Sequence, residues 1–516
     1  MKLRLFRIFF SIIIFILFVY VFFVSNNLSI IIGNTLNFFQ FIPSVLRFLA
    51  SGITLLSIGF IIILIITFFF GRLYCSFLCP LGILQDFFIY ISNKIKKKLN
   101  FIKPYNWIRY SVFISVLFFS IIGIMVLLNI FDPYSIFSRS LTNIFKPIFS
   151  LIINNIVIFL KMNKIYLNLF YKIHKFNLNL LLFSVISFSV ILIFSILKGR
   201  LYCNTICPVG TLLGFVSKYS IINVLLDKDK CTSCRLCEKV CKACCIDSNN
   251  KKVDLSRCIS CFNCLDLCPQ KAINYKVIKK DDKKSIDYSR RKFLKYFFPA
   301  SLVSFTILGA FIRKPFIAFR NNVKVNKKML ITPPGSQSIN NFVDLCTSCH
   351  TCVNECPTKV LRPAGFLNMM QPTMDYSYAF CDYECNICTK VCPSGAIKPL
   401  QLDIKKRTQI GKADLKKELC LVYESDLECG ACAEHCPTKA VFMIPYKKIF
   451  SPETNTDICI GCGACEYVCP ATPEKAIIVE GNEIHKINEV ANIGEIEDNS
   501  QEKIIKEEPL DEDFPF

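Results

Sequence analysis

The stretch GRLYCSFLCPLG, residues 71–82, recurs in the chain as GRLYCNTICPVG, residues 199–210, with eight of twelve positions identical. Each copy follows an uninterrupted apolar stretch, near residues 48–70 and 180–197. Such a duplication predicts two related pairs of helices. The ends of these helices would bring together the cysteines of the two C-x3-C-P motifs, which are Cys75, Cys79, Cys203 and Cys207.

Two further apolar stretches lie near residues 6–24 and 110–129, so four stretches reach the roughly 20 residues that cross a bilayer. The loop between the second and third stretches holds seven basic residues and one acid, Asp86. Because Lys and Arg mark cytoplasmic loops, we expect this loop and the N-terminus in the cytoplasm. The formal charge of +22 is concentrated beside these stretches, which argues against nucleic acid as a partner.

The segment of residues 130–179 is then expected on the outer side of the membrane, opposite the cytoplasm. Its apolar patch near residues 147–160 is shorter than a span, which predicts an interfacial or re-entrant helix. Asp132 stands directly before Pro133. Asp-Pro suits the N-cap and first-turn positions of a helix, so we expect Asp132 to cap one.

A basic soluble domain over residues 211–288 contains two cysteine runs of the form C-x2-C-x2-C-x3-C. This is the bacterial two-cluster ferredoxin pattern, in which the fourth cysteine of each run ligates the other cluster. We expect one [4Fe-4S] cluster on Cys231, Cys234, Cys237 and Cys268, and the other on Cys258, Cys261, Cys264 and Cys241. Zinc sites use pairs rather than this trio-plus-one spacing. Cys244 and Cys245 lie outside the pattern and are expected to be small buried side chains.

A second soluble domain over residues 313–484 contains four more runs, each with Pro after its last cysteine. The runs are Cys346, Cys349, Cys352 and Cys356; Cys381, Cys385, Cys388 and Cys392; Cys420, Cys429, Cys432 and Cys436; and Cys459, Cys462, Cys465 and Cys469. These thiolates suffice for four clusters, making six in the chain. We expect cross-ligation between the first and fourth runs and between the second and third.

One segment of this domain also fits a c-type haem signature, because Cys346, Cys349 and His350 spell C-x-x-C-H. A haem there would leave Cys352 and Cys356 without a role, although both stand at ferredoxin spacing. The cluster interpretation is therefore preferred.

Residues 289–312 join the two soluble domains. SRRKFLK, residues 289–295, matches a twin-arginine export signal, and the apolar stretch after it predicts a fifth membrane helix that stays as an anchor. The alternative is a plain basic flank of that helix. Either interpretation places residues 313–516 outside the cytoplasm, and the acidic residues 485–516 are expected to form a disordered tail.

The C-x3-C-P cysteines have several possible roles. Four cytoplasmic thiols at the mouth of a bundle could hold a cluster or another metal, or could cycle as dithiols. Structural helix ends are the plain alternative, but the near-complete duplication argues against it.

The pattern resembles two families joined in one chain. The four helices, the paired C-x3-C-P motifs and the two-cluster domain resemble the NapH/NosR-type membrane ferredoxins, over residues 1–275. The twin-arginine run with four cluster motifs resembles the NapG type, over residues 286–480. The resemblance implies quinol dehydrogenase function and a periplasmic cytochrome or reductase as partner. The flavin-bearing outer domain of the NosR branch has no counterpart before the first helix.

The predicted fold is thus an α-helical membrane bundle, four helices plus a fifth anchor, with two α+β ferredoxin-like iron–sulfur domains. The predicted protein lies in the inner membrane, with its C-terminal domain in the periplasm. We expect electron transfer between the quinol pool and a periplasmic acceptor, with bound quinone as a further cofactor. The alternative is an accessory reductase that uses cytoplasmic electrons for metal-centre assembly.

Overall fold

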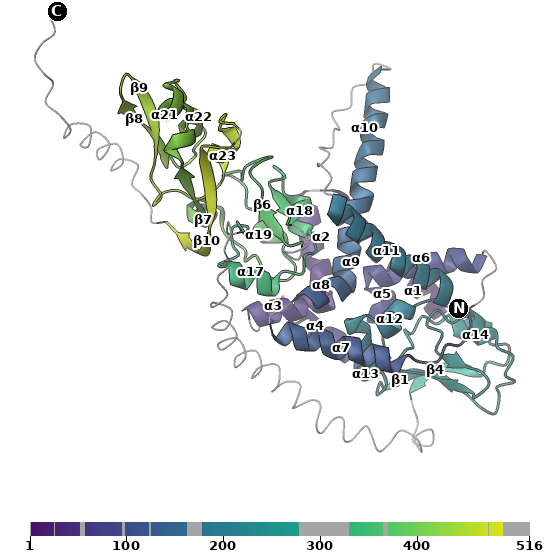
Figure 1. Cartoon of the computed structure of the whole chain (residues 1–516). Helices are drawn as coiled ribbons and strands as arrows, with labels where there is room; N and C mark the ends of the chain where they lie inside the picture. Colours follow the sequence, from purple (N-terminus) through teal and green to yellow (C-terminus); the bar gives the residue numbers. More distant parts are fainter. Residues whose placement is uncertain are drawn as a thin grey trace, which may run out of the picture. The chain divides into compact units, whose positions relative to one another are not determined.

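The computed structural model describes residues 2–24, 26–51, 57–94, 99–122, 125–162, 178–277, 330–364, 370–472 and 474–488 (Figure 1). The chain divides into two compact units. Unit 1 comprises Met1–Asn326, Asn340–Thr373 and Ile387–Lys398, and unit 2 comprises Lys327–Ile339, Met374–Asn386 and Pro399–Phe516. The twin-arginine run and the predicted fifth helix lie outside the described residues.

Three helical segments among the described residues are long and apolar enough to cross a membrane, namely Leu3–Phe23, Pro133–Phe159 and Leu180–Lys198. They belong to α1 (Lys2–Phe23), to the continuous run of α9 (Pro133–Ser140), η2 (Leu141–Phe145) and α10 (Lys146–Met162), and to α11 (Leu178–Lys198). A bent pair, α2 (Asn27–Phe38) and α3 (Phe41–Ser51), makes a fourth span if it is counted as one; its helices meet at 90°.

Two of the four predicted spans differ from this arrangement. The described part of 48–70 is mainly α4 (Gly59–Phe70), of 12 residues, and 110–129 is divided between α7 (Asn106–Ile121) and α8 (Val126–Phe131). A helix of 12 residues is about 18 Å long and does not cross the hydrocarbon alone. The apolar composition of these stretches was predictable, but the helix breaks within them were not.

The predicted interfacial helix at 147–160 is instead part of the 27-residue segment Pro133–Phe159. Pro147 lacks the N–H that would bond to the preceding turn, which ordinarily ends or kinks a helix. Here the wider π-helical turn η2 lies directly before it, so the helix continues past the proline. The bundle consequently has a long segment where the sequence suggested a short one.

The predicted cap at Asp132 is confirmed. Its carboxylate accepts hydrogen bonds from the backbone N–H groups of Tyr134 and Ser135, and Pro133 occupies the first turn of α9. A second cap, at Asn26, begins α2 with a reciprocal pair of hydrogen bonds to Ser29. These caps stabilise the turns that divide the bundle into separate helices.

The two copies of the duplicated sequence fold alike. Each follows an apolar helix, α4 or α11, which ends at a glycine with positive φ, Gly71 at 78° and Gly199 at 62°. A one-turn helix then carries the first cysteine, in α5 (Tyr74–Phe77) and α12 (Leu201–Thr205). A longer helix begins at the proline after the second cysteine, in α6 (Pro80–Lys94) and α13 (Pro208–Ser217).

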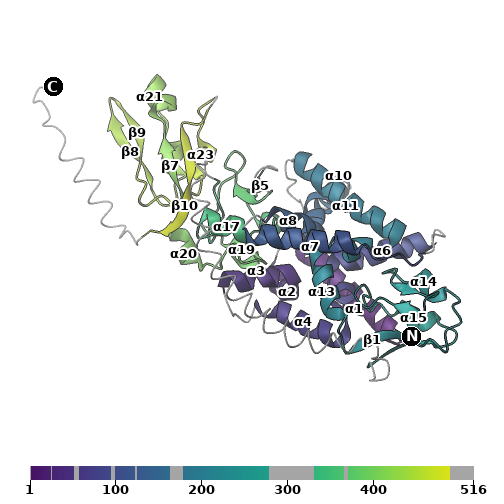
Figure 2. The same cartoon turned by 60° about the horizontal axis from the view of Figure 1, so that its bottom comes forward.

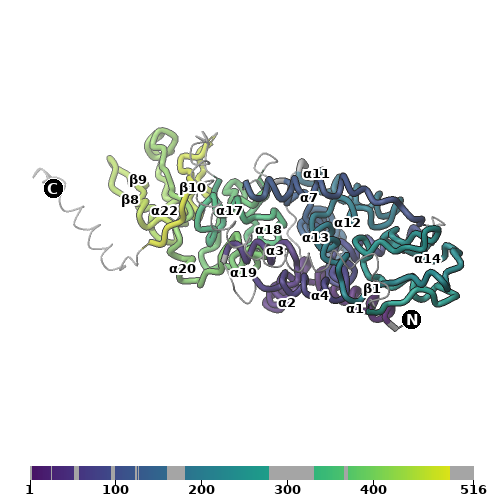
Figure 3. Tube along the Cα trace, turned by 90° about the horizontal axis from the view of Figure 1, so that it is seen from below, coloured from purple at the N-terminus to yellow at the C-terminus, as the bar shows by residue number. Residues whose placement is uncertain are grey.

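The rest of unit 1 is a set of short elements at the ends of the helices. Strands β1 and β4 pair antiparallel, with Ile222 opposite Val277. The helices α14 and α15 come between these strands in the sequence, and in space they lie beside the N-terminal end of α1 (Figure 2). The remaining cysteine helices, α18 and α19, lie near α2 (Figure 3). The bounds are β1 (Ile222–Leu226), α14 (Leu236–Val240), β2 (Ile246–Asp247), β3 (Lys252–Val253), α15 (Asn263–Leu267), β4 (Ile273–Val277), α17 (Ile339–Leu345), α18 (Thr351–Glu355), β5 (Leu361–Pro363), β6 (Pro372–Met374) and α19 (Ile387–Val391).

Unit 2 is built on two antiparallel strand pairs, β7 with β10 and β8 with β9. Strand β10 continues to Ile487, so residues 485–487 belong to a strand and not to the predicted tail. The rest of that tail lies outside the described residues. The bounds are α20 (Leu402–Arg407), β7 (Thr408–Leu415), η5 (Lys417–Leu419), α21 (Leu421–Ser425), α22 (Ala431–Glu434), β8 (Val441–Tyr446), β9 (Ile449–Thr454), α23 (Ala464–Val468) and β10 (Ile477–Ile487).

Candidate metal centres

Four of the six ferredoxin-type runs share one unusual backbone conformation. Between the first and third cysteines of each run, two residues have positive φ. These residues are Ser233 and Arg235, Ser260 and Phe262, Ser348 and His350, and Gly461 and Gly463. Turns that alternate right- and left-handed residues point successive N–H groups toward a common centre, forming the concavities that hold phosphates and iron–sulfur clusters. The backbone of these runs therefore fits a cluster independently of the cysteines.

In the first soluble domain the structure brings together Cys258, Cys261 and Cys264 of one run with Cys241 of the other. These four thiols line one recess. Cys231, Cys234 and Cys237 also interact with one another electrostatically. The crossed arrangement at Cys241 is the one expected of a two-cluster ferredoxin.

Cys245 adds an interaction that the spacing did not reveal. Its sulfur lies 3.6 Å from that of Cys241, and it also hydrogen-bonds to Cys258. Hydrogen bonding from Cys245 lowers the pKa of Cys241 to about 7 and also lowers that of Cys258. Cys245 thus lies beside two predicted ligands and favours their thiolate form.

In the second soluble domain the pairing differs from the prediction. Within unit 1, Cys346, Cys349 and Cys352 interact with Cys392 of the second run. Within unit 2, Cys459, Cys462 and Cys465 interact with Cys436, and Cys420, Cys429 and Cys432 share a recess with Cys469. The first run thus pairs with the second and the third with the fourth, because consecutive runs form each two-cluster module.

Both ring nitrogens of His350, the histidine of the haem-like signature, contact other protein groups. His350 is fully buried, and its Nε2 lies 2.9 Å from the carbonyl oxygen of Met370. Its Nδ1 lies 3.4 Å from the amide nitrogen of Asn143. Both ring nitrogens therefore have protein partners.

The four C-x3-C-P cysteines converge in the core of unit 1. Each thiol is 4–5% exposed, and all belong to one apolar cluster of buried residues. Electrostatic interactions link Cys79 with Cys203 and Cys75, and link Cys207 with the other three. The convergence that the duplication predicts is present, in a site closed to solvent.

Two arginines cross between the copies of the duplicated sequence. Arg72 donates through Nη2 to the carbonyl oxygen of Cys203 at 3.1 Å, and Arg200 donates to the carbonyl oxygen of Cys75. Both side chains are fully buried. A Cβ atom at Gly82 would lie 2.4 Å from the Cys75 carbonyl oxygen, and one at Gly210 would lie 2.1 Å from that of Cys203. The arginine and the final glycine of GRLYC-x3-CP-x-G are therefore explained by this crossing.

The surroundings of these thiols are cationic. Asp86 forms ion pairs with Arg200, Arg7 and Lys242, so three cations share one carboxylate. Arg72 instead contacts neutral groups, Asn204 Oδ1 and the Ser256 carbonyl oxygen, and lies 3.7 Å from the Cys75 sulfur. A buried guanidinium requires a compensating charge, and a thiolate at Cys75 would supply it.

The side chains at these sites indicate whether a single metal ion or an iron–sulfur cluster fits them. Among the described residues, no three His, Cys, Asp or Glu side chains converge closely enough for a single metal ion. A four-iron cube holds its thiolates further apart than a tetrahedral ion does. The ferredoxin-type runs, with their concave N–H turns, therefore fit iron–sulfur clusters. The four C-x3-C-P thiols beside buried arginines fit one as well.

Sequence reasoning missed Arg72, Arg200 and the ligand-contacting Cys245. The first two could have been found, because they stand at matching positions of the two copies. Nothing in the spacing distinguishes Cys245 from Cys244, whose thiol donates to the Lys198 carbonyl instead.

Comparison with known families supports the same chemistry. Residues 52–98 and 180–228, which contain the two C-x3-C-P motifs, match a family described as 4Fe-4S binding domain. Residues 345–422 and 427–472 each match a 4Fe-4S dicluster domain, in agreement with the pairing of consecutive runs. No solved structure matches the chain.

Several characterised proteins are similar over part of the chain. Ferredoxin-type protein NapG of Haemophilus influenzae is 29% identical over 213 residues, 38% of this chain and 74% of that protein. The methylamine utilization ferredoxin-type protein MauM of Methylobacillus flagellatus is 30% identical over 27% of this chain and 64% of that protein. Ferredoxin-type protein NapF of Escherichia coli is 32% identical over 145 residues, 28% of this chain and 81% of that protein. The chain therefore belongs to the family of ferredoxin-type proteins that includes NapF, whose multiple [4Fe-4S] sites serve electron transfer.

Proposed function

We propose that the protein is a membrane-bound polyferredoxin that transfers electrons between the quinol pool and an acceptor or reductase outside the cytoplasm. One observation carries the proposal: a single apolar helix, α1, contacts one cysteine domain near its first turn and another at its last. Arg4 pairs with Asp266 at 3.6 Å, within the run that ends at Cys268. The Phe22 carbonyl oxygen accepts from Asn354 Nδ2 at 3.0 Å, within the run that ends at Cys356.

The length of α1 between these contacts matches a membrane. Arg4 and Phe22 are eighteen residues apart, which at 1.5 Å per residue is about 27 Å. The hydrocarbon core of a bilayer is about 30 Å thick. The basic residues Arg4 and Arg7 stand at one end, as cytoplasmic flanks do. These features favour cysteine sites on opposite faces, with the C-terminal domain outside.

Electrons that cross this thickness need an intermediate site, and the buried four-cysteine site suits that role. It contacts the first soluble domain through Arg72, which donates to the Ser256 carbonyl oxygen at 3.1 Å. Toward the other end, the Tyr202 hydroxyl donates to Phe131 and the Asn129 amide donates to the Cys346 carbonyl oxygen. We therefore propose a seventh iron–sulfur site on Cys75, Cys79, Cys203 and Cys207.

The iron content tests the number of sites. Six four-iron clusters correspond to about 24 irons per chain, and a seventh raises the value to about 28. Replacing Cys75 and Cys203 with Ser should then remove about four irons. Unchanged iron in this double variant would limit the count to the ferredoxin-type runs.

The proposed reaction balances simply. A quinol loses two electrons and two protons to become a quinone. The electrons pass one at a time through the iron–sulfur sites to the outer acceptor, and the protons pass to water. When bound, the clusters supply the one-electron steps that connect a two-electron donor to this chain of sites.

Turnover in proteoliposomes tests the proposal. The purified protein receives a membrane quinol, and an impermeant one-electron oxidant is placed outside. We expect oxidant reduction that depends on the quinol. If reduction requires an electron donor on the N-terminal side and quinol is inert, the protein is instead the accessory reductase for metal-centre assembly.

The predicted location is tested separately. Export of residues 313–484 through the twin-arginine run remains a proposal, as do the domain limits at 210, 288 and 312. In intact spheroplasts, external protease should cleave the 346–469 region and leave the 231–268 region intact. Protection of both regions would place both domains in the cytoplasm.

A further inference from the structure

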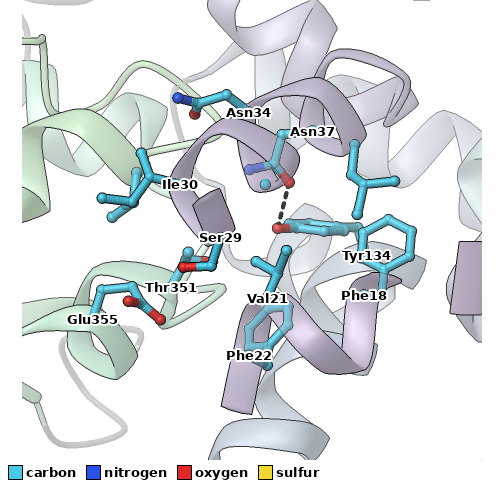
Figure 4. Close-up of a pocket in the computed structure, with 13 residues that line it drawn as sticks. Phe18, Val21, Phe22, Ser29, Ile30, Asn34, Asn37, Tyr134, Thr351 and Glu355 are labelled. Atoms are coloured by element: carbon cyan, nitrogen blue, oxygen red, sulfur yellow. Dashed lines mark hydrogen bonds between the residues drawn. The ribbon is translucent and has the colours of Figure 1, made fainter. Parts of the chain in front are cut away.

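A narrow, partly open recess lies where the end of α1 meets α2, α9 and the first cysteine run of the second soluble domain. The space in the recess and in its open mouth together is about 380 Å³. All its walls belong to unit 1. Figure 4 shows Phe18, Val21 and Phe22 of α1 on one side and Ile30 of α2 on another. At Gly33, a Cβ atom would lie only 3.1 Å from Val21, so the glycine lets the two helices approach closely.

Polar groups line several parts of this largely apolar recess (Figure 4). The Tyr134 hydroxyl donates to Asn37 Oδ1 at 2.7 Å, and both groups face the recess (Figure 4). Ser29, Thr351 and Glu355 also line it. An apolar cavity with a few convergent hydrogen-bonding groups is the usual form of a site for a small aromatic ligand.

Thr351 connects the recess to the predicted cluster ligands. Its hydroxyl lies 3.4 Å from the Cys349 sulfur and also interacts with the Tyr134 hydroxyl. Val391 also lines the recess and directly precedes Cys392, which joins Cys346, Cys349 and Cys352 in one site. A ligand bonded to Tyr134 would thus lie within one side chain of a cluster-binding sulfur.

The outer surfaces of the same helices are apolar. Ile16 of α1 is 58% exposed, and Leu28 and Ile31 of α2 are 55% and 64% exposed. Ile16 lies on α1, which is long enough to span a membrane, and Leu28 and Ile31 lie on α2, which forms a span only together with α3. In a bilayer such side chains contact lipid. A ligand with a long hydrocarbon tail could therefore keep its tail in lipid while its head enters the recess.

We propose that this recess binds the ring of an isoprenoid quinone, with Tyr134, Asn37 and Thr351 as hydrogen-bonding partners of its oxygens. The proposal rests on the proposed function and gives it a location. The quinone lies beside the site of Cys346, Cys349, Cys352 and Cys392, so electrons from quinol enter these clusters without crossing the bilayer. The site of Cys75, Cys79, Cys203 and Cys207 would then connect the same clusters with those of the first soluble domain. Two one-electron transfers to that site and release of two protons to water complete the oxidation of each quinol.

Photolabelling tests the location without relying on turnover. Protein purified anaerobically with its clusters is irradiated with an azido-ubiquinone, with and without excess unlabelled ubiquinone, and labelled peptides are mapped. Ile30→Trp fills the recess, whereas Ile31→Trp places the same side chain on the exposed face of the same helix. Tyr134→Phe retains the volume and removes one hydroxyl. Iron content verifies that each variant is folded.

In the wild type and in Ile31→Trp, we expect azido-ubiquinone to label residues 18–37 and excess unlabelled ubiquinone to suppress that labelling. In Ile30→Trp the labelling should be at least tenfold lower. In Tyr134→Phe about tenfold more unlabelled ubiquinone should be needed to suppress it. Labelling confined to another region, or equal labelling in Ile30→Trp, overturns the location. Cluster reduction by ubiquinol is measured in the same samples. If ubiquinol reduces the clusters but the recess is not labelled, the proposed function holds and the quinone binds elsewhere. If the recess is labelled but ubiquinol does not reduce the clusters, the binding site holds and quinol oxidation is refuted.

Discussion

Arg72 donates a hydrogen bond of 3.1 Å to the carbonyl oxygen of Cys203, the first cysteine of the other copy of the duplicated sequence. Arg200 makes the reciprocal bond to the carbonyl oxygen of Cys75. Each copy therefore fixes the backbone that presents the other copy's thiol. Each half of the site therefore depends on the other copy for one buried backbone contact.

Loss of this crossing should destabilise the bundle. Arg72→Ala leaves the Cys203 and Ser256 carbonyl oxygens without this donor in a buried site, which we expect to cost about 2–4 kcal/mol. Arg4→Ala removes only a half-exposed ion pair of 3.6 Å and should cost less than about 1 kcal/mol. Thermal unfolding of the two purified variants compares them. Equal shifts in Tm would show that the crossing does not hold the copies together.

The glycines that admit the crossing should not tolerate a side chain. In Gly82→Ala the new methyl group would lie 2.4 Å from the Cys75 carbonyl oxygen and 2.7 Å from Arg200, so the backbone must shift. We expect lower Tm and loss of the iron assigned to the four-cysteine site. Gly430→Ala is the matched control, because its methyl group meets only Glu434 Oε1 at 3.7 Å. A normal iron content in Gly82→Ala would contradict this interpretation.

Cys245 should tune a cluster without binding it. Hydrogen bonds to ligand sulfurs raise the reduction potential of an iron–sulfur cluster. Cys245→Ala should therefore retain full iron and lower one midpoint potential by about 40 mV, the equivalent of a hydrogen bond of about 1 kcal/mol. Cys244→Ala, whose thiol bonds to the Lys198 carbonyl, is the control. Loss of iron from Cys245→Ala would make this residue a ligand.

His485 should make the stability of unit 2 depend on pH. Burial lowers its pKa to about 4, while the unfolded chain has a value of about 6.5. The unfolded state therefore binds the proton more tightly, and this contribution to stability is complete above about pH 6.5 and is lost as the pH falls toward 4. The loss should not exceed about 3 kcal/mol. Tm at pH 7 and pH 5 should differ more in the wild type than in His485→Gln; equal differences would exclude His485.

The cysteine runs were predictable because their ligand pattern is local. Three cysteines at C-x2-C-x2-C spacing require a short turn, and the structure provides it with left-handed residues such as Ser260 and Phe262. Which two cysteine runs combine in one module was harder to predict. Cys392 joins Cys346 because the chain returns through a tertiary fold, and spacing alone does not contain that information.

The apolar helices show the opposite case. Hydropathy identified the apolar stretches, but helix ends depend on caps and proline geometry. The Asp132 cap was predictable from the Asp-Pro pair, whereas passage of a helix through Pro147 was not, since it relies on the preceding π-helical turn. The recess beside Tyr134 was also beyond sequence reasoning, because its walls come from segments more than 300 residues apart.

Reduction of the clusters by quinol would show that the protein is a quinol-linked polyferredoxin. Anaerobically purified, oxidised protein is mixed with excess ubiquinol and frozen, and its EPR spectrum is compared with that of a dithionite-reduced sample. We expect quinol to produce reduced-cluster signals in the wild type and in Ile31→Trp, and much weaker signals in Ile30→Trp. Clusters that dithionite reduces and quinol leaves oxidised, with a quinol of suitable potential, would contradict the proposed function.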